Sequence, residues 1–275
     1  MDAKLTGQVV LITGASGGIG SAIARQFAAE GAKLVLHGYR NAAALTKLQK
    51  ELVAVETLAI RADLTREGAV KKLFAQAEKR FGRVDTLIAN AGSWAKSSVP
   101  LHEKSLRQWR STLDGVLTSA FLCTREFFRL VKKQKQGNAV LLGSTAAVFG
   151  EAGHADYASA KAALAFGLTR SLKNELARLA PHTVKYCGGR INCVCPGWTI
   201  VPRNQVKLGD AKMIRRVTAT MALPKIARPD DIASAVVFLS SDALAGHITG
   251  QALVVAGGME GRMLWQPEEL DSSLA

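Results

Sequence analysis

The chain has 275 residues, of which 48% are hydrophobic and 21% charged, a composition typical of a globular protein and not of a disordered chain or a disulfide scaffold. Its formal net charge of +14 can attract anions, but a charge excess more often marks a solvated surface. No apolar run reaches the length of a membrane span, and the N-terminus lacks the basic start and apolar stretch of a signal peptide. We therefore expect a cytoplasmic protein that does not bind membranes.

Short β-branched runs alternate with longer helical stretches from end to end, without internal repeats. This alternation predicts an α/β fold, a doubly wound Rossmann-type parallel sheet with helices on both faces. In chain order, we expect seven strands at 9–12, 34–36, 57–60, 84–88, 139–142, 191–195 and 252–255. The crossover helices are expected at 18–30, 42–53, 66–81, 106–131, 157–179 and 230–239.

Two stretches depart from the alternation of strands and helices. Residues 201–229 form a long insertion after the sixth expected strand, and residues 260–275 form a polar tail after the seventh. Insertions beyond the carboxyl ends of parallel strands are where such sheets bind ligands. We expect one domain over residues 1–259, although the length would also allow two small domains.

The first expected strand runs into a glycine-rich loop that opens the first expected helix, Thr13-Gly14-Ala15-Ser16-Gly17-Gly18-Ile19-Gly20. Glycines there let the backbone turn sharply and approach a pyrophosphate, while the helix N-terminus offers free N–H groups and partial positive charge. A glycine-rich turn without a ligand is the alternative, but strand, loop and helix in register favour nucleotide binding. No Lys-Ser or Lys-Thr follows the glycines, which disfavours a P-loop.

The Gly-x-x-x-Gly-x-Gly spacing resembles that of the short-chain dehydrogenase/reductase family, and the resemblance extends along nearly the whole chain. Matching segments follow in the family's order: Asp63-Leu64, Asn90-Ala91-Gly92, Ser144 thirteen residues before Tyr157, Tyr157-x-x-x-Lys161, and Pro196-Gly197. The resemblance, together with Arg40, implies a cofactor site of Gly14, Ser16, Gly18, Ile19, Gly20, Arg40, Asp63, Leu64, Asn90, Ala91, Gly92, Tyr157, Lys161, Pro196, Gly197 and Thr199. It also implies a homodimer or homotetramer acting on a small carbonyl or alcohol substrate.

Arg40 decides our expectation about the cofactor. An NAD enzyme normally places a carboxylate at the end of the second strand, where it binds the adenosine ribose. No Asp or Glu occurs between Glu30 and Glu51, and the forked donors of Arg40 are placed to meet a ribose 2′-phosphate. This predicts NADP(H) in preference to NAD(H). A solvated Arg at a helix start is the alternative, and the glycine loop lacks the extra basic residue that some NADP-using relatives carry.

Ser144, Tyr157 and Lys161 are the expected catalytic residues. Tyr157 and Lys161 are four residues apart, so on a helix they face the same side, one turn removed. A free tyrosine titrates near ~10, and a neighbouring ammonium favours the phenolate, so Tyr157 would be the acid in reduction and the base in oxidation. Ser144 would hold the substrate oxygen for hydride attack. The resemblance gives Lys161 a hydrogen bond to the nicotinamide ribose.

Two positions depart from the family's pattern. Val116 replaces the Asn, immediately before a Leu-Thr pair, that in the family helps to hold a water in the proton relay. Val201 occupies the place of a Thr that usually touches the cofactor phosphates. The missing Asn keeps open a second function, a cofactor-binding protein with little turnover that serves as a sensor or assembly partner. The intact catalytic residues argue for an NADP(H)-dependent oxidoreductase instead.

In the family that this chain resembles, the segment corresponding to residues 201–229 is the substrate lid, and here this expected lid is strongly basic. Against a single acid, Asp210, it holds Arg203, Lys207, Lys212, Arg215, Arg216, Lys225 and Arg228. This excess suggests an anionic substrate, while a solvated helical face or a subunit contact explains it at least as well. No aromatic residues interleave the basic ones, so we expect no nucleic-acid partner. The cysteines lack zinc-site spacing, and we expect no metal.

Overall fold

The computed structural model describes residues 2–92, 98–202, 204 and 210–265. Over these residues the chain forms one parallel sheet of seven strands in the order β3-β2-β1-β4-β5-β6-β7, which confirms the predicted fold class. The strands are β1 (Val9–Ile12), β2 (Lys33–Gly38), β3 (Thr57–Arg61), β4 (Thr86–Ala89), β5 (Asn138–Leu142), β6 (Arg190–Pro196) and β7 (Ala252–Val255). The order reverses between β1 and β4, and such a switch point creates a crevice at the carboxyl ends of the strands.

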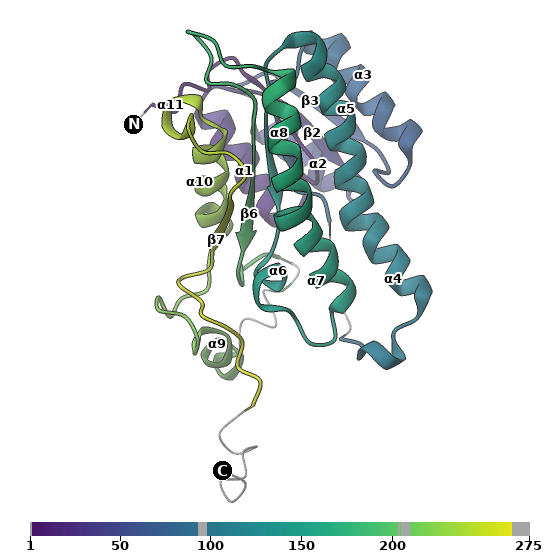
Figure 1. Ribbon diagram of the computed structural model, residues 1–275, viewed down its shortest axis with the longest axis vertical. Coiled ribbons are helices and arrows are strands. Elements are labelled where there is room, and N and C mark those ends of the chain that lie inside the picture. Colours follow the sequence, from purple (N-terminus) through teal and green to yellow (C-terminus); the bar gives the residue numbers. More distant parts are fainter. Residues whose placement is uncertain (1, 93–97, 203, 205–209, 266–275) are drawn as a thin grey trace, which may run out of the picture.

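Helices cover both faces of the sheet (Figure 1). They are α1 (Gly18–Ala29), α2 (Ala42–Glu51), α3 (Glu67–Phe81), α4 (Leu106–Leu113), α5 (Ser119–Gln134), α6 (Thr145–Phe149), α7 (Ala155–Ala162), α8 (Thr169–Leu179), α9 (Ala211–Thr218), α10 (Pro229–Ser240) and α11 (Asp242–Ala245). A short 3₁₀ turn, η1 (Leu101–Glu103), precedes α4. None of the described helices is long and apolar enough to span a membrane.

Alternate residues of β1 supply the two hydrophobic cores because successive side chains of a strand point to opposite faces. Val9 and Leu11 belong to the core under α3, α5 and α8, where Phe127 is fully buried. Val10 and Ile12 belong to the core under α1, α2 and α10. All four residues of β1 are buried, as their unbroken apolar run predicts for a central strand.

The two long helices predicted at 106–131 and 157–179 are each interrupted by a turn of π-helix, which the prediction missed. The turns are η2 (Asp114–Thr118), between α4 and α5, and η3 (Ala163–Leu168), between α7 and α8. A π turn inserts one residue while keeping near-helical backbone angles, so the sequence pattern still indicates a continuous helix. Such turns are frequent at functional sites, and η2 contains Val116.

The first residues of the expected tail, Glu260 and Gly261, pack against the segment that follows α9. Met259 forms a bridge with Met221, the Glu260 N–H donates to the Thr220 carbonyl over 3.1 Å, and the Thr220 hydroxyl donates to the Gly261 carbonyl over 2.9 Å. The chain after β7 therefore runs along the segment that follows α9, as the yellow trace in Figure 1 shows.

Candidate active site

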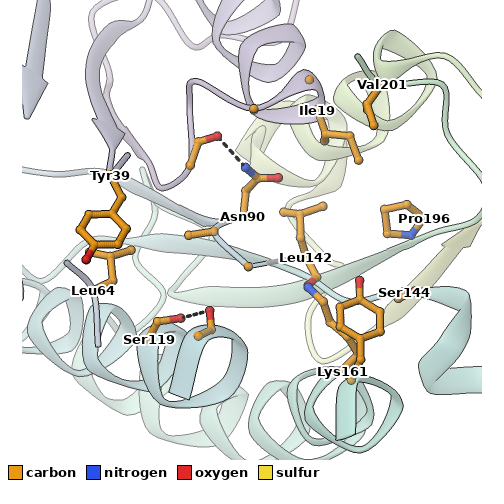
Figure 2. A pocket seen from close by; sticks show the side chains of 18 of the residues that line it. Ile19, Tyr39, Leu64, Asn90, Ser119, Leu142, Ser144, Lys161, Pro196 and Val201 are labelled. Carbon is orange, nitrogen blue, oxygen red and sulfur yellow. Dashed lines mark hydrogen bonds between the residues drawn. The ribbon is translucent and has the colours of Figure 1, made fainter. Parts of the chain in front are cut away.

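The carboxyl ends of the strands open into a cleft of about 1470 Å³. Every predicted cofactor-binding or catalytic residue lines it: Gly14, Ser16, Gly18, Ile19, Gly20, Arg40, Asp63, Leu64, Asn90, Ala91, Gly92, Ser144, Tyr157, Lys161, Pro196, Gly197 and Thr199. Figure 2 shows Ile19, Asn90, Ser144, Lys161 and Pro196 around this space. Residues from the ends of six strands, β1 to β6, thus meet along one cleft, as expected at the switch point of the sheet.

The glycine loop has the shape that a phosphate needs. Gly14 has a φ of +66°, a conformation that side chains disfavour, and a Cβ on Gly20 would lie 2.2 Å from the Gly14 carbonyl oxygen. Gly17, the N-cap residue of α1, has no side chain to cap the helix, and among the described residues no side chain takes its place at the first N–H groups. The loop therefore fits the pyrophosphate of a dinucleotide.

Asn90 braces the glycine loop from the neighbouring strand end. Its Nδ2 donates to the Thr13 carbonyl over 2.9 Å and to the Gly14 carbonyl over 3.2 Å. Figure 2 draws one of these two bonds. The Ala91 N–H donates to the Thr13 hydroxyl over 2.9 Å. These bonds fix the loop after β1 against the end of β4.

His37 is a site residue that sequence reasoning missed. The Gly14 N–H donates to His37 Nδ1 over 3.1 Å, and His37 Nε2 lies 3.0 Å from the Ala62 carbonyl. Nδ1 must accept while Nε2 donates, so the imidazole is neutral. Burial lowers the pKa of His37, against the opposing effect of the bond to Ala62. One buried ring on β2 thereby joins the loops that follow β1 and β3.

After the end of β2, Arg40 lines the cleft without an acidic partner among the described residues. Its guanidinium carbon lies 5.4 Å from the centroid of the Tyr39 ring. The Tyr39 hydroxyl donates to Asp63 over 3.2 Å, and Asp63 also accepts from the hydroxyl and N–H of Thr65. Hydrogen bonds from Thr65 lower the pKa of Asp63, although burial opposes them. The carboxylate is thus held by its own loop, and the donors of Arg40 are available to a ligand.

The structure brings Ser144, Tyr157 and Lys161 together. Ser144 caps α6, its Oγ accepting from the Ala146 N–H over 3.1 Å. Lys161 is buried, its Nζ donating to the Leu142 carbonyl over 2.5 Å and lying 5.7 Å from the centroid of the Tyr157 ring. Figure 2 shows Ser144 and Lys161 on the same side of the cleft. The end of β5 and one face of α7 therefore place a hydroxyl, a phenol and an ammonium at a common point.

The two departures from the family's pattern lie in different surroundings. Val116 is fully buried in η2, and a Cβ on Gly92 would lie 3.5 Å from its Cγ2. Ser119, three residues later, lines the cleft, and its hydroxyl donates to the carbonyls of Gly115 and Val116 over 2.9 and 3.3 Å. Figure 2 draws one of these two bonds. Val201 also lines the cleft and packs on the glycine loop, where a Cβ on Gly18 would lie 2.7 Å from its Cγ1.

The cleft is also lined by residues that the sequence did not suggest. Trp198, Glu151 and Arg262 line this cleft. Trp198 packs with Phe149 on a small core of Val217, Met221, Ala256 and Met259. The apolar residues of α9 thus face this small core.

The basic residues of the predicted lid do not line the cleft in the described part of the chain. Lys212, Arg215, Arg216, Lys225 and Arg228 are all exposed and lie outside the lining, whereas Arg203 and Lys207 are outside the described residues. Within the described ranges, no group of three or more His, Cys, Asp or Glu side chains could hold a metal ion.

Comparison with known proteins identifies the family. A family model described as enoyl-(acyl carrier protein) reductase matches residues 14–260. A 3-oxoacyl-[acyl-carrier-protein] reductase of Synechocystis sp. is 34% identical, covering 93% of this chain and 98% of the relative. A cis-4-hydroxycyclohexanecarboxylate dehydrogenase of Sinomonas cyclohexanicum is also 34% identical, covering 91% and 96%. The chain belongs to the short-chain dehydrogenase/reductase family.

A solved structure agrees with this assignment. The 7α-hydroxysteroid dehydrogenase complexed with NADH and 7-oxo glycochenodeoxycholic acid is similar with a TM-score of 0.84 and 28% identity, over 94% of this chain and 96% of that chain. The protein is therefore an oxidoreductase that uses a nicotinamide cofactor and acts on a small alcohol or carbonyl compound.

Proposed function

We propose that the protein is an NADP(H)-dependent oxidoreductase that interconverts a carbonyl compound and a secondary alcohol. The observation that carries the proposal is the meeting of Ser144, Tyr157 and Lys161 in the same cleft as the uncapped glycine loop. The cofactor supplies or accepts the hydride when bound. The 34% identity to two relatives named as a reductase and a dehydrogenase supports this class of reaction.

The proposed catalytic roles follow from the chemistry of the three side chains. The Ser144 hydroxyl donates a hydrogen bond to the substrate oxygen and fixes its position. The Tyr157 hydroxyl gives its proton to that oxygen in reduction and takes one back in oxidation. The buried Lys161 ammonium lies 5.7 Å from the centroid of the Tyr157 ring, so a positive charge stands beside the phenol. The same ammonium is placed to bind the nicotinamide ribose.

Arg40 supports the choice of NADP(H). Its guanidinium, which has no acidic partner among the described residues, stands after the end of β2, where the family's NAD enzymes carry a carboxylate. A charged hydrogen bond to a 2′-phosphate contributes about 1.5–3 kcal/mol. We expect NADPH to bind roughly 10- to 100-fold more tightly than NADH. Arg40→Ala should remove this preference, whereas Lys50→Ala, which removes a charge from α2 outside the cleft, should keep it. Equal affinity of the wild type for both cofactors, measured by fluorescence titration, would exclude the role of Arg40.

Val116 favours one alternative, a cofactor-binding protein with little turnover. The residue is buried among apolar side chains and offers no side-chain hydrogen bond to a relay water. A wild-type protein that binds NADPH but reduces nothing in a broad carbonyl panel would support this alternative. Turnover of any member of the panel, lost in Tyr157→Phe, would support the oxidoreductase.

Assembly and location are part of the proposal. We infer a cytoplasmic homodimer or homotetramer from membership of the family. Light scattering coupled to size-exclusion chromatography gives the oligomeric state directly, and a monomer would contradict the inference.

A further inference from the structure

Glu151 and Arg262 form an ion pair in the cleft. Arg262 Nη2 lies 2.8 Å from Glu151 Oε2, and both side chains line the cleft that contains Ser144 and Tyr157. Their side chains are only 17% and 16% exposed, so the pair is largely withdrawn from water. Charges held in this way are costly unless they are well paired.

Arg262 is held in place independently of Glu151. Its Nε donates to the Gly150 carbonyl over 2.7 Å, and its Nη2 donates to the hydroxyl of Thr145, the residue after Ser144, over 3.3 Å. The preceding backbone is fixed by the bonds of Glu260 and Gly261 to Thr220. The segment after β7 thus holds the Arg262 guanidinium in a fixed position next to Thr145, the neighbour of Ser144.

Glu151 is the more weakly held member of the pair. Among the described residues, its carboxylate has no polar partner other than Arg262. Burial raises the pKa of Glu151, while Arg262 opposes that rise. The Nη1 group of Arg262 makes no hydrogen bond within the described part of the chain. A second carboxylate can therefore take the place of Glu151 on a guanidinium that keeps its other contacts.

We infer that Arg262 is a specificity-determining residue that binds the carboxylate of an oxo-acid or hydroxy-acid substrate in place of Glu151. The carbon body of the substrate would lie against the apolar part of the cleft where Trp198 stands. A cationic group on the substrate is disfavoured, because it would have to displace Arg262 from three partners to reach Glu151. This inference rests on the proposed function and adds the class of substrate to it.

The test compares a carboxylate with its uncharged ester. We would measure NADPH-dependent reduction of 4-oxocyclohexanecarboxylate, whose ring keeps carbonyl and carboxylate apart, and of its methyl ester. For the wild type, kcat/KM should favour the acid by about 10- to 100-fold, the effect of a charged hydrogen bond. Arg262→Ala should abolish this preference mainly through KM for the acid, with the ester little affected. Glu151→Gln should lower KM for the acid because the competing charge is gone.

The control separates recognition from a structural role. Arg215→Ala removes a charge from the exposed face of α9, outside the cleft, and should keep the preference. Equal loss of activity on acid and ester in Arg262→Ala would mean that the ion pair only anchors the chain after β7, and would overturn the inference.

A binding measurement separates this inference from the proposed reaction. Isothermal titration calorimetry with cyclohexanecarboxylate and cyclohexanecarboxamide, which have no reducible ketone, reports recognition without turnover. Stronger binding of the carboxylate that Arg262→Ala removes supports the inference, even if the protein reduces neither oxo compound and the proposed function fails. Equal binding of the two probes by the wild type would overturn this inference and leave the proposed function standing.

Discussion

A buried ion pair ties the segment before α4 to the helix that carries Tyr157. Lys104 Nζ lies 3.0 Å from Asp156 Oδ1 and donates to the Gly153 carbonyl over 3.2 Å, while the Thr112 hydroxyl donates to Asp156 Oδ2 over 2.7 Å. Burial alone would raise the pKa of Asp156, but the hydrogen bonds from Thr112 and Lys104 hold it below its ordinary value. Asp156 is therefore ionised near neutral pH and depends on Lys104.

Lys104→Met should destabilise the protein because it leaves that carboxylate buried and unpaired. The side chains of Lys104 and Asp156 are 1% and 0% exposed, and removing one partner of such a pair costs about 3–5 kcal/mol. The same substitution at Lys71, whose ion pair with Glu67 has side chains 50% and 48% exposed, should cost about 0.5 kcal/mol or less. The double variant Lys104→Met/Asp156→Asn should recover much of the loss, because the stranded charge is gone.

Urea denaturation followed by circular dichroism at pH 7.5 and pH 4.5 measures these differences. In the wild type, the lowered pKa of Asp156 contributes stability above the ordinary value of 3.8, and that contribution is lost as the pH falls through the folded-state pKa. In Lys104→Met, we expect that pKa to rise, so the gap to the wild type should narrow at pH 4.5. Similar losses in the two lysine variants, or a double variant no more stable than Lys104→Met, would refute this reasoning.

Three further predictions concern the cleft. Tyr157→Phe should remove nearly all NADPH oxidation while leaving cofactor binding intact, whereas Lys161→Ala should weaken both; substantial turnover in the Phe variant would show that another acid serves. Val116→Asn should change the rate of reduction of a reactive diketone by less than about 10-fold. A rate gain near the roughly 10²- to 10⁴-fold that positioned acid–base catalysis contributes would show that proton transfer is impaired in the wild type. Because burial lowers the pKa of His37, the wild type should lose stability as the pH falls below 6.5, where the unfolded chain binds a proton that the folded protein does not. In urea titrations, His37→Asn should therefore lose less free energy of unfolding than the wild type between pH 7.5 and 5.5. Equal losses in the two proteins would contradict this.

The sequence by itself determined the class of fold and the outline of the cofactor site. The apolar run of β1, the glycines that follow it and the spacing of Tyr157 and Lys161 are local patterns, each read within a few residues of chain. In a parallel sheet, the carboxyl ends of the strands lie on one edge, so residues placed after separate strands could be expected to meet. The prediction of the sheet and of the residues that line the cleft needed no tertiary contact.

Only the tertiary structure decided what surrounds those residues. The π turn at η2 keeps near-helical backbone angles and does not change the apolar pattern of the sequence. The sequence therefore did not predict that Val116 lies fully buried within a π turn. The basic residues of the expected lid are exposed in the described part because α9 turns its apolar residues inward. His37 and Arg262 act through partners 23 and 117 residues away along the chain, Gly14 and Thr145. Contacts over such separations follow from how the strands and loops are brought together, which no local pattern encodes.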